Sequence, residues 1–355
     1  MVFWDKSLHL IGGVMCFVAS SFPVGAQENP KLRVGVRVDA APFAWKDDAN
    51  TFNGLIYDFC RIALENADLE YGVVDATVAN RLDRLVAQGS TPRTYDILCG
   101  PTSITISRSQ KYFLSPPIFV SGGSFIASGG AFGRFHQAAI ARLAEREEDG
   151  LPVIGPDGSE IQGASRDEKI RSVRQESIPE CDQIDTETQI VGARLGYVQG
   201  TTGRNVIDQA WLAEAPPVKV AAFQTICAEA QLNHEIAVER LCDGIITHHF
   251  GDRDIVEYYL MQGVGTSFPA CDAKASSEFY TAEPYAIAIS PELDGATVRQ
   301  FISGILEVMG SGVRSDTGDG TIIPLTDHLF SRTFKAREMG ATLRELYTIL
   351  RVPKE

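Results

Sequence analysis

The segment YDILCGPTSITISR, residues 95–108, decides both the fold and the kind of site that this chain carries. Its first five residues form a short apolar run, which is the pattern of a buried strand. A loop of small and hydroxyl-bearing residues follows and leads to Arg108. Such a loop places free backbone N–H groups, hydroxyls and a guanidinium around one point, and the parallel N–H donors of an arginine match a carboxylate. The segment therefore predicts a carboxylate-binding site beyond the end of a strand.

Strand and helix patterns alternate on both sides of this segment, which favours an α/β fold with mostly parallel sheets. In the first series, the predicted elements are strands over 32–38 and 95–99 and helices over 54–65 and 79–88. In the second series, they are strands over 194–198, 218–223 and 244–247 and helices over 205–212 and 236–241. The last predicted elements are a strand over 285–289 and helices over 297–309 and 335–351.

A charged segment rich in glycine and proline, residues 129–190, separates the two series. We expect a surface excursion there, with one helix over 137–147. The glycine-rich stretch over 310–320 lacks the spacing of a phosphate-binding loop and predicts a plain loop.

The N-terminus has the pattern of a secretory signal peptide over residues 1–26. Lys6 supplies the positive charge, an apolar run over 10–18 follows, and small residues at 24–26 form a cleavage site. We therefore expect an exported protein, periplasmic or secreted. Six cysteines lie outside this segment, and an even number in an exported chain favours disulfides, with the pairing left open. Buried reduced thiols are the alternative.

Composition and charge narrow the function. The chain has 355 residues, of which 44% are hydrophobic and 22% charged, as in globular proteins. A formal charge of −14 argues against binding to nucleic acid or to anionic membranes. An anionic ligand would need arginines concentrated locally against this overall field, so individual arginines are informative.

Motifs of cofactor-dependent and hydrolytic enzymes are absent from the sequence, which has no HExxH, GxSxG, P-loop or dinucleotide fingerprint. No cofactor and no metal site is predicted. His248 and His249 would point to opposite faces of a strand and so could not share an ion. We expect His248 alone to lie at the carboxyl end of its strand, where α/β sheets bind ligands.

Residues 32–126 resemble the family 3 extracellular solute-binding proteins, the periplasmic amino-acid receptors of ABC transporters. The resemblance rests on the order of several short motifs: LRVGV (32–36), Pro42-Phe43, Gly54 with Asp58, YDILCG (95–100), TSIT (102–105) with Arg108, and FLSPP (113–117). The second half continues it with LGYVQGTT (195–202), LCDG (241–244) and EPYAIAI (283–289).

The resemblance implies a two-lobe fold in which each lobe is a mostly parallel sheet flanked by helices. Lobe 1 would comprise residues 27–125 and 284–355, and lobe 2 residues 126–283, joined by two hinge crossings. A monomer would close on a small ligand in the cleft. Its partner would be the membrane permease of an ABC transporter.

The resemblance also assigns site residues. Arg108 would hold the ligand α-carboxylate, helped by the hydroxyl of Ser103 and by the turn at Thr201 and Thr202. That turn opens a helix, whose free N–H groups and dipole suit an anion.

Three further residues bear on the ligand. Arg37 stands where the glutamate- and aspartate-binding subgroup has an arginine for the side-chain carboxylate, and Asp39 is a second cleft candidate. His248 stands where the family usually has an aspartate for the ligand ammonium, a role that imidazole fills poorly. The expected ligand is therefore an acidic amino acid or a dicarboxylate, with the amine left open.

Two alternatives remain at this point. One is an enzyme on the same fold, similar to cyclohexadienyl dehydratases, with His248 or Asp39 as proton donor. The other is a protein-interaction or sensory module in which residues 129–190 dock a partner.

Overall fold

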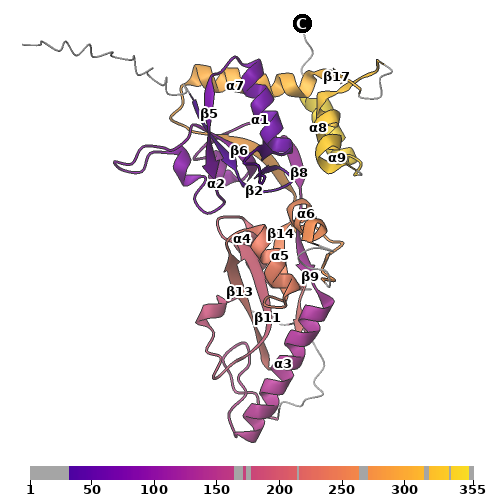
Figure 1. Cartoon of the computed structure of the whole chain (residues 1–355). Coiled ribbons are helices and arrows are strands. Elements are labelled where there is room, and N and C mark those ends of the chain that lie inside the picture. Colours follow the sequence, from indigo (N-terminus) through magenta and orange to yellow (C-terminus); the bar gives the residue numbers. More distant parts are fainter. Residues whose placement is uncertain are drawn as a thin grey trace, which may run out of the picture.

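The computed structural model describes residues 32–163, 171–172, 177–213, 216–263, 271–315, 320–335 and 337–351. The predicted signal peptide lies outside the described residues. Two lobes lie one above the other, and the chain passes twice between them (Figure 1). None of the helices in the described ranges is long and apolar enough to cross a bilayer.

The first lobe is built on a mixed sheet in the order β5-β1-β6-β16-β7, with β8 paired to β16. Strand β1 runs parallel to β5 and β6, whereas β16 is antiparallel to β6, β7 and β8. The strands are β1 (Leu32–Arg37), β5 (Tyr71–Ala76), β6 (Ile97–Ser103), β7 (Phe113–Leu114), β8 (Phe119–Ser121) and β16 (Glu283–Ile289). A small second sheet joins β2 (Asp39–Ala40), β3 (Ala44–Lys46) and β4 (Phe52–Asn53).

The helices of this lobe are α1 (Leu55–Asn66), α2 (Ile106–Ser109), α7 (Gly295–Gly310), α8 (Leu325–Phe334) and α9 (Ala341–Leu350). The lobe also contains the 3₁₀ turn η1 (Asp83–Leu85) and a hairpin formed by β17 (Gly312–Arg314) and β18 (Ile322–Pro324). Helix α1 buries Leu55, Phe59 and Ala63 on one face, as its helical spacing predicts. That face packs against α7, where a Cβ on Gly304 would lie 2.1 Å from the backbone oxygen of Ala63. Only glycine permits this close helix contact.

The second lobe is built on a sheet in the order β13-β11-β14-β9-β15. Its strands are β9 (Gly123–Ala127), β11 (Ile190–Val198), β13 (Gln224–Gln231), β14 (His248–Asp252) and β15 (Lys274–Ala275). Strands β13, β11 and β14 are parallel, and β9 is antiparallel to β14 and β15. The remaining elements are α3 (Gly129–Glu148), α4 (Gly203–Leu212), α5 (His234–Cys242), α6 (Arg253–Gly263), η2 (Cys181–Gln183) and the pair β10 (Arg171–Ser172) with β12 (Lys219–Val220).

Strands β8 and β9 belong to different sheets although only Gly122 separates them, and β15 and β16 mark the return crossing. The sheets therefore meet at two crossings. The lobe limits at 125/126 and 283/284 stay a prediction.

Several predicted elements differ from the observed ones. The predicted helix over 79–88 is only the short turn η1, because its carbonyls are taken by other partners: Tyr95 Oη donates to Arg81 O at 2.5 Å and Thr94 N to Arg84 O at 2.9 Å. The helix expected over 137–147 is the longer α3, which begins at residue 129 with Ser128 as its cap. Strands β5, β9 and β13 and helices α6 and α8 were among the elements that the sequence did not predict.

All six cysteines form disulfides: Cys60–Cys99, Cys181–Cys227 and Cys242–Cys271. The expectation of disulfides is confirmed. The two cysteines of each disulfide lie 29 to 46 residues apart along the chain. Such cross-links restrict the unfolded chain and stabilise a protein by roughly 3–4 kcal/mol each.

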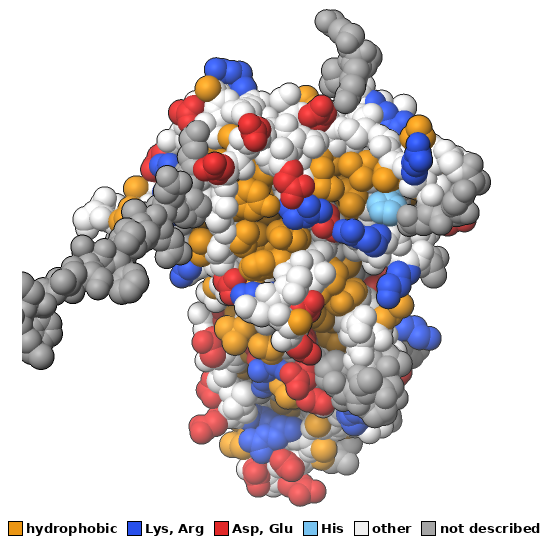
Figure 2. All heavy atoms as spheres, turned by 45° about the horizontal axis from the view of Figure 1, so that its top comes forward, with side chains coloured by type: hydrophobic (Ala, Val, Ile, Leu, Met, Phe, Trp, Pro, Cys, Tyr) orange, Lys and Arg blue, Asp and Glu red, His pale blue; other side chains and the backbone are white. Residues whose placement is uncertain are grey.

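The surface mixes both signs of charge. Figure 2 shows acidic and basic side chains interspersed around an apolar area on one face.

Candidate ligand-binding site

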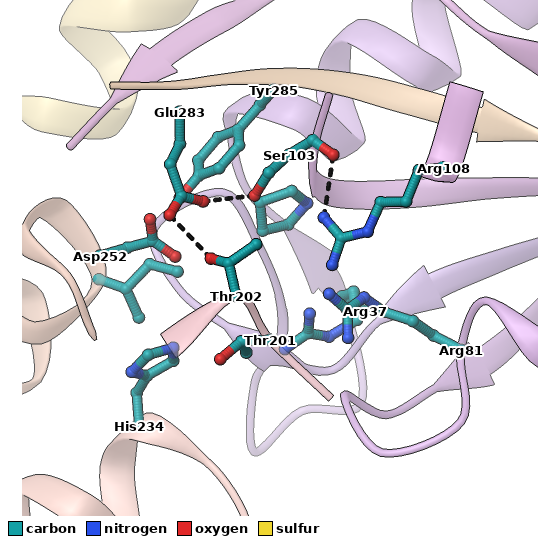
Figure 3. Close-up of a pocket in the computed structure, with 12 residues that line it drawn as sticks. Arg37, Arg81, Ser103, Arg108, Thr201, Thr202, His234, Asp252, Glu283 and Tyr285 are labelled. Carbon is teal, nitrogen blue, oxygen red and sulfur yellow. Dashed lines mark hydrogen bonds between the residues drawn. The ribbon is translucent and has the colours of Figure 1, made fainter. Parts of the chain in front are cut away.

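A cavity between the two sheets gathers charged side chains from both lobes (Figure 3). It is lined by Arg37, Arg81, Pro101, Ser103, Arg108, Thr201, Thr202, His234, Asp252, Ile255, Glu283 and Tyr285. The free space in it is about 20 Å³, roughly room for a single water molecule. A larger ligand can enter only if the lobes separate.

The first lobe contributes three arginines. Arg37 is the last residue of β1, and its Nε donates to Asp39 Oδ1 at 2.6 Å. A Cβ on Gly100 would lie 2.3 Å from Cγ of Arg37, so the glycine leaves room for this side chain. Arg108 lies in α2, where Thr105 caps the helix, and its Nη1 donates to the carbonyl oxygen of Ser103 at 2.9 Å.

Arg81 is the most constrained of the three. It is 4% exposed, and among the described residues its Nη1 donates only to backbone carbonyls, that of Val78 at 2.7 Å and that of Gly200 at 3.4 Å. Its Nε has no hydrogen-bond partner within the same ranges. Burial, and then the neighbouring Arg37 and Arg108, hold the pKa of Arg81 well below its ordinary value. Within the described residues neither Arg81 nor Arg108 forms an ion pair, and a buried charge without a partner is costly.

The opposite wall is acidic. Asp252 is the last residue of β14, and Glu283 is the first residue of β16. Burial, reinforced by the nearby Glu283, raises the pKa of Asp252 to about 8. Figure 3 places these two carboxyl groups on one side of the cavity and the three arginines on the other, with Thr202 between them. The cavity thus separates positive from negative charge.

His234 begins helix α5 and presents a neutral imidazole to the cavity. Nδ1 of His249 lies 3.0 Å from the carbonyl oxygen of Gly196 and must therefore carry the proton. Nε2 of His249 is then an acceptor for Nδ1–H of His234, 3.2 Å away. With its Nδ1 protonated in these hydrogen bonds, neutral His234 has an unprotonated Nε2 that can accept a hydrogen bond. Burial, and then His249 and the arginines, hold the pKa of His234 well below its ordinary value.

Five residues predicted from the sequence line this cavity: Arg37, Ser103, Arg108, Thr201 and Thr202. Ahead of helix α4, Thr201 Oγ1 accepts a hydrogen bond from the N–H of Gly203 at 3.1 Å. Asp39 is not on the lining and lies behind it, bonded to Arg37 and accepting from the N–H of Val78 at 3.3 Å.

The predicted placement of His248 is wrong. The predicted strand over 244–247 is absent because these residues complete the end of α5: Gly244 has a φ of 75°, and N–H of Ile245 donates to the carbonyl of Arg240 at 2.9 Å. Strand β14 therefore starts at His248 and ends at Asp252, which reaches the cavity. His248 instead packs against Phe132 with ring centroids 5.6 Å apart, and burial lowers its pKa to about 4.

Sequence reasoning missed seven lining residues, of which five carry polar side chains: Arg81, His234, Asp252, Glu283 and Tyr285. A local signal for Asp252 was present, because an aspartate directly before a helical pattern is a common helix start. Glu283 and Tyr285 stood in the quoted motif EPYAIAI but were not assigned a role. No local pattern distinguishes Arg81 from a surface arginine.

A larger cavity of about 1030 Å³ lies elsewhere, between α1, α6 and α8. Its wall carries aromatic side chains together with arginines that form ion pairs: Arg332 pairs with Asp58, and Arg337 with Asp254. Lys335, also on this wall, is exposed to solvent, so the lining shows no buried cation without an ion pair among the described residues. The charged cavity between the lobes is the better candidate.

The chain has relatives of known architecture. Residues 32–282 match the model of the bacterial extracellular solute-binding proteins, family 3. Among solved structures, the arginine-, lysine-, histidine-binding protein ArtJ from Geobacillus stearothermophilus aligns with a TM-score of 0.54 and 13% identity, over 88% of this chain and 99% of that one. An ancestral arginine-binding protein bound to arginine gives 0.53 and 16%, over 85% and 97%.

The ancestral amino acid-binding protein AncCDT-1, a precursor of cyclohexadienyl dehydratase, aligns with a TM-score of 0.52 and 16% identity, over 85% of this chain and 95% of that one. Comparison with curated protein sequences gives no match. The structural similarities establish the two-lobe fold of periplasmic binding proteins, and the family match covers more than half of the sequence. This chain belongs to the bacterial extracellular solute-binding proteins of family 3.

Proposed function

We propose that this protein is an exported receptor that binds an acidic amino acid between its lobes and delivers it to an ABC transporter. The observation that carries this proposal is the buried Arg81, which has no acidic partner among the described residues and lies with Arg37 and Arg108 in the same cavity. Such a cluster is costly to bury unless an anion joins it.

Three arginines suit a ligand with two carboxylates. Arg108, Ser103 and the start of α4 would hold the α-carboxylate, and Arg37 with Arg81 would hold the side-chain carboxylate. Guanidinium groups bind carboxylates through paired, charge-assisted hydrogen bonds, which are the strong ones.

Asp252 favours an amino acid over a dicarboxylate without an amine. Its carboxyl group lies at the acidic wall, and a ligand ammonium placed there would favour its ionised form. His234 adds an acceptor nitrogen, as derived above, that can receive an N–H. The poor match between an imidazole and a ligand ammonium concerned His248, which lies outside the cavity lining.

Binding would be coupled to hinge closure. Ligand groups on both walls are contacted together only when the lobes are closed, so the ligand shifts the equilibrium towards closure. The first lobe, whose sheet includes β16 with Glu283, would move against the second lobe, whose sheet includes β9, as a monomer. A periplasmic location and a permease partner follow from the family's usual role.

A thermal-shift screen of mature protein tests this proposal. The panel contains L-glutamate, L-aspartate, their amides, L-arginine, succinate and glutarate. We expect stabilisation by glutamate or aspartate, because a ligand at about a hundredfold excess over Kd adds roughly 2.7 kcal/mol. Stabilisation by arginine, with none by the acidic amino acids, would contradict the proposal.

An enzyme similar to cyclohexadienyl dehydratase is the second candidate. Asp252, whose pKa of about 8 leaves it protonated at neutral pH, is the observation that favours it. Asp39 is bonded to Arg37, and His248 lies outside the lining, so neither fits the donor role first expected. Turnover of prephenate by wild type, lost in Asp252→Asn, would establish this alternative.

A further inference from the structure

The carboxylate of Glu283 is held by donors from both lobes. Glu283 is 7% exposed and lies where the chain returns to the first sheet. Its oxygens accept hydrogen bonds from Ser103 Oγ on β6 and from Thr202 Oγ1, next to α4, at 2.9 Å (Figure 3). Thr281 Oγ1 adds a third contact at 3.2 Å. One carboxylate therefore bridges the two lobes across the cavity.

The same two hydroxyls are required by the ligand. A hydroxyl carries a single proton, so it donates to one acceptor at a time. While Ser103 and Thr202 donate to Glu283, neither can donate to a ligand carboxylate. Arg108 lies beside this arrangement, since it donates to the backbone oxygen of Ser103.

We propose that the carboxylate of Glu283 competes with the ligand carboxylate for the hydroxyls of Ser103 and Thr202. Glu283 acts as a latch that holds the lobes together, and it must release both hydroxyls before a ligand can bind them. The identity of the ligand in this inference rests on the proposed function, but the latch itself does not.

Charge adds to the competition. A ligand carboxylate placed at Ser103 and Thr202 would stand next to the carboxylate of Glu283, and like charges repel strongly in a cavity shielded from water. Binding is therefore an exchange of one carboxylate for another. The exchange lowers the apparent affinity and favours ligands whose second carboxylate gains the arginine cluster.

The test uses full-length mature protein with Glu283→Ala and Glu283→Gln. The alanine variant removes the latch, whereas the glutamine variant removes the charge and keeps the shape. Glu278→Gln, an exposed residue of the same segment, is the control for loss of one negative charge. Small-angle X-ray scattering measures the separation of the lobes without added ligand, and calorimetry measures the affinity for L-glutamate and L-aspartate.

We expect Glu283→Ala to increase the radius of gyration and to bind the acidic amino acid about tenfold more tightly, since hydrogen bonds to a charged group no longer compete. Glu283→Gln should also bind more tightly, and Glu278→Gln should match wild type. An unchanged radius of gyration in Glu283→Ala overturns the latch, and a loss of affinity in both variants overturns the competition.

Two further controls keep the outcomes distinct. If circular dichroism finds Glu283→Ala unfolded, Thr202→Val removes the interlobe hydrogen bond and must itself enlarge the radius of gyration. If wild type binds neither acidic amino acid, the proposed function fails, while scattering of the protein without ligand still decides the latch.

Discussion

The substitution Arg81→Met is expected to abolish ligand binding while leaving the protein without ligand as stable as wild type or more so. Arg81 is 4% exposed and has only two carbonyl partners in the part of the chain that the structure describes, so its guanidinium is poorly compensated there. Replacing a buried charge by an apolar side chain of similar length is often neutral or stabilising by about 1–4 kcal/mol. The two lost hydrogen bonds, each worth about 1–1.5 kcal/mol, offset part of this gain.

The effect on binding has the opposite sign. Truncating one partner of a buried charge pair costs about 3–5 kcal/mol, which corresponds to a loss of affinity by a factor of roughly 10² to 10³ or more. Chemical denaturation measures the free energy of unfolding, and calorimetry measures the affinity for L-glutamate and L-aspartate. Arg142→Met, on the exposed face of α3, is the matched control and should change neither quantity. A clear loss of stability with unchanged affinity would refute the assignment of Arg81 to the ligand.

Three further predictions concern the amine site, the buried histidine and the helix contact. Asp252→Asn should weaken L-glutamate by about a hundredfold but leave glutarate unaffected, because only glutamate has an ammonium; calorimetry with both ligands measures this, and equal losses would exclude an amine role. Burial lowers the pKa of His248 to about 4, so near pH 6.5 the unfolded chain binds a proton at this histidine and the folded protein does not. The contribution of His248 to the free energy of unfolding is full above about pH 6.5 and falls by up to about 3 kcal/mol as the pH drops to 4. Urea unfolding of His248→Leu should show a free energy of unfolding that depends less on pH, and an unaltered pH dependence would contradict this. Gly304→Val should lower the free energy of unfolding by about 1–3 kcal/mol, because its Cβ would meet Ala63 O at 2.1 Å, and an unchanged melting temperature would refute the close packing of α1 on α7.

The sequence predicted the parts of the site that depend on short stretches of chain. Ser103 and Arg108 belong to one loop after one strand, and Thr201 with Thr202 to one turn before a helix, so local pattern places them. Arg37 was assigned from the family resemblance alone.

The missed residues depend on tertiary contacts. Arg81 reaches the cavity because its segment gives up helical hydrogen bonds in favour of Tyr95 and Thr94, which lie more than ten residues further along the chain. The end of β14 depends on pairing with β11 and β9, since apolar residues on both sides of His248 are compatible with several strand limits. Because of this ambiguity, the sequence pattern predicted His248 at the position in the cavity where the structure has Asp252.

Under the proposed function, the arginine cluster selects a second carboxylate on an amino acid. Calorimetric titration of the mature protein with L-glutamate against L-glutamine, and with L-aspartate against L-asparagine, tests it most directly, because each pair differs only in one charged group. At least one acid should bind about a hundredfold or more tightly than its amide. Equal affinity for acid and amide in both pairs, or tighter binding of the amides, would contradict it.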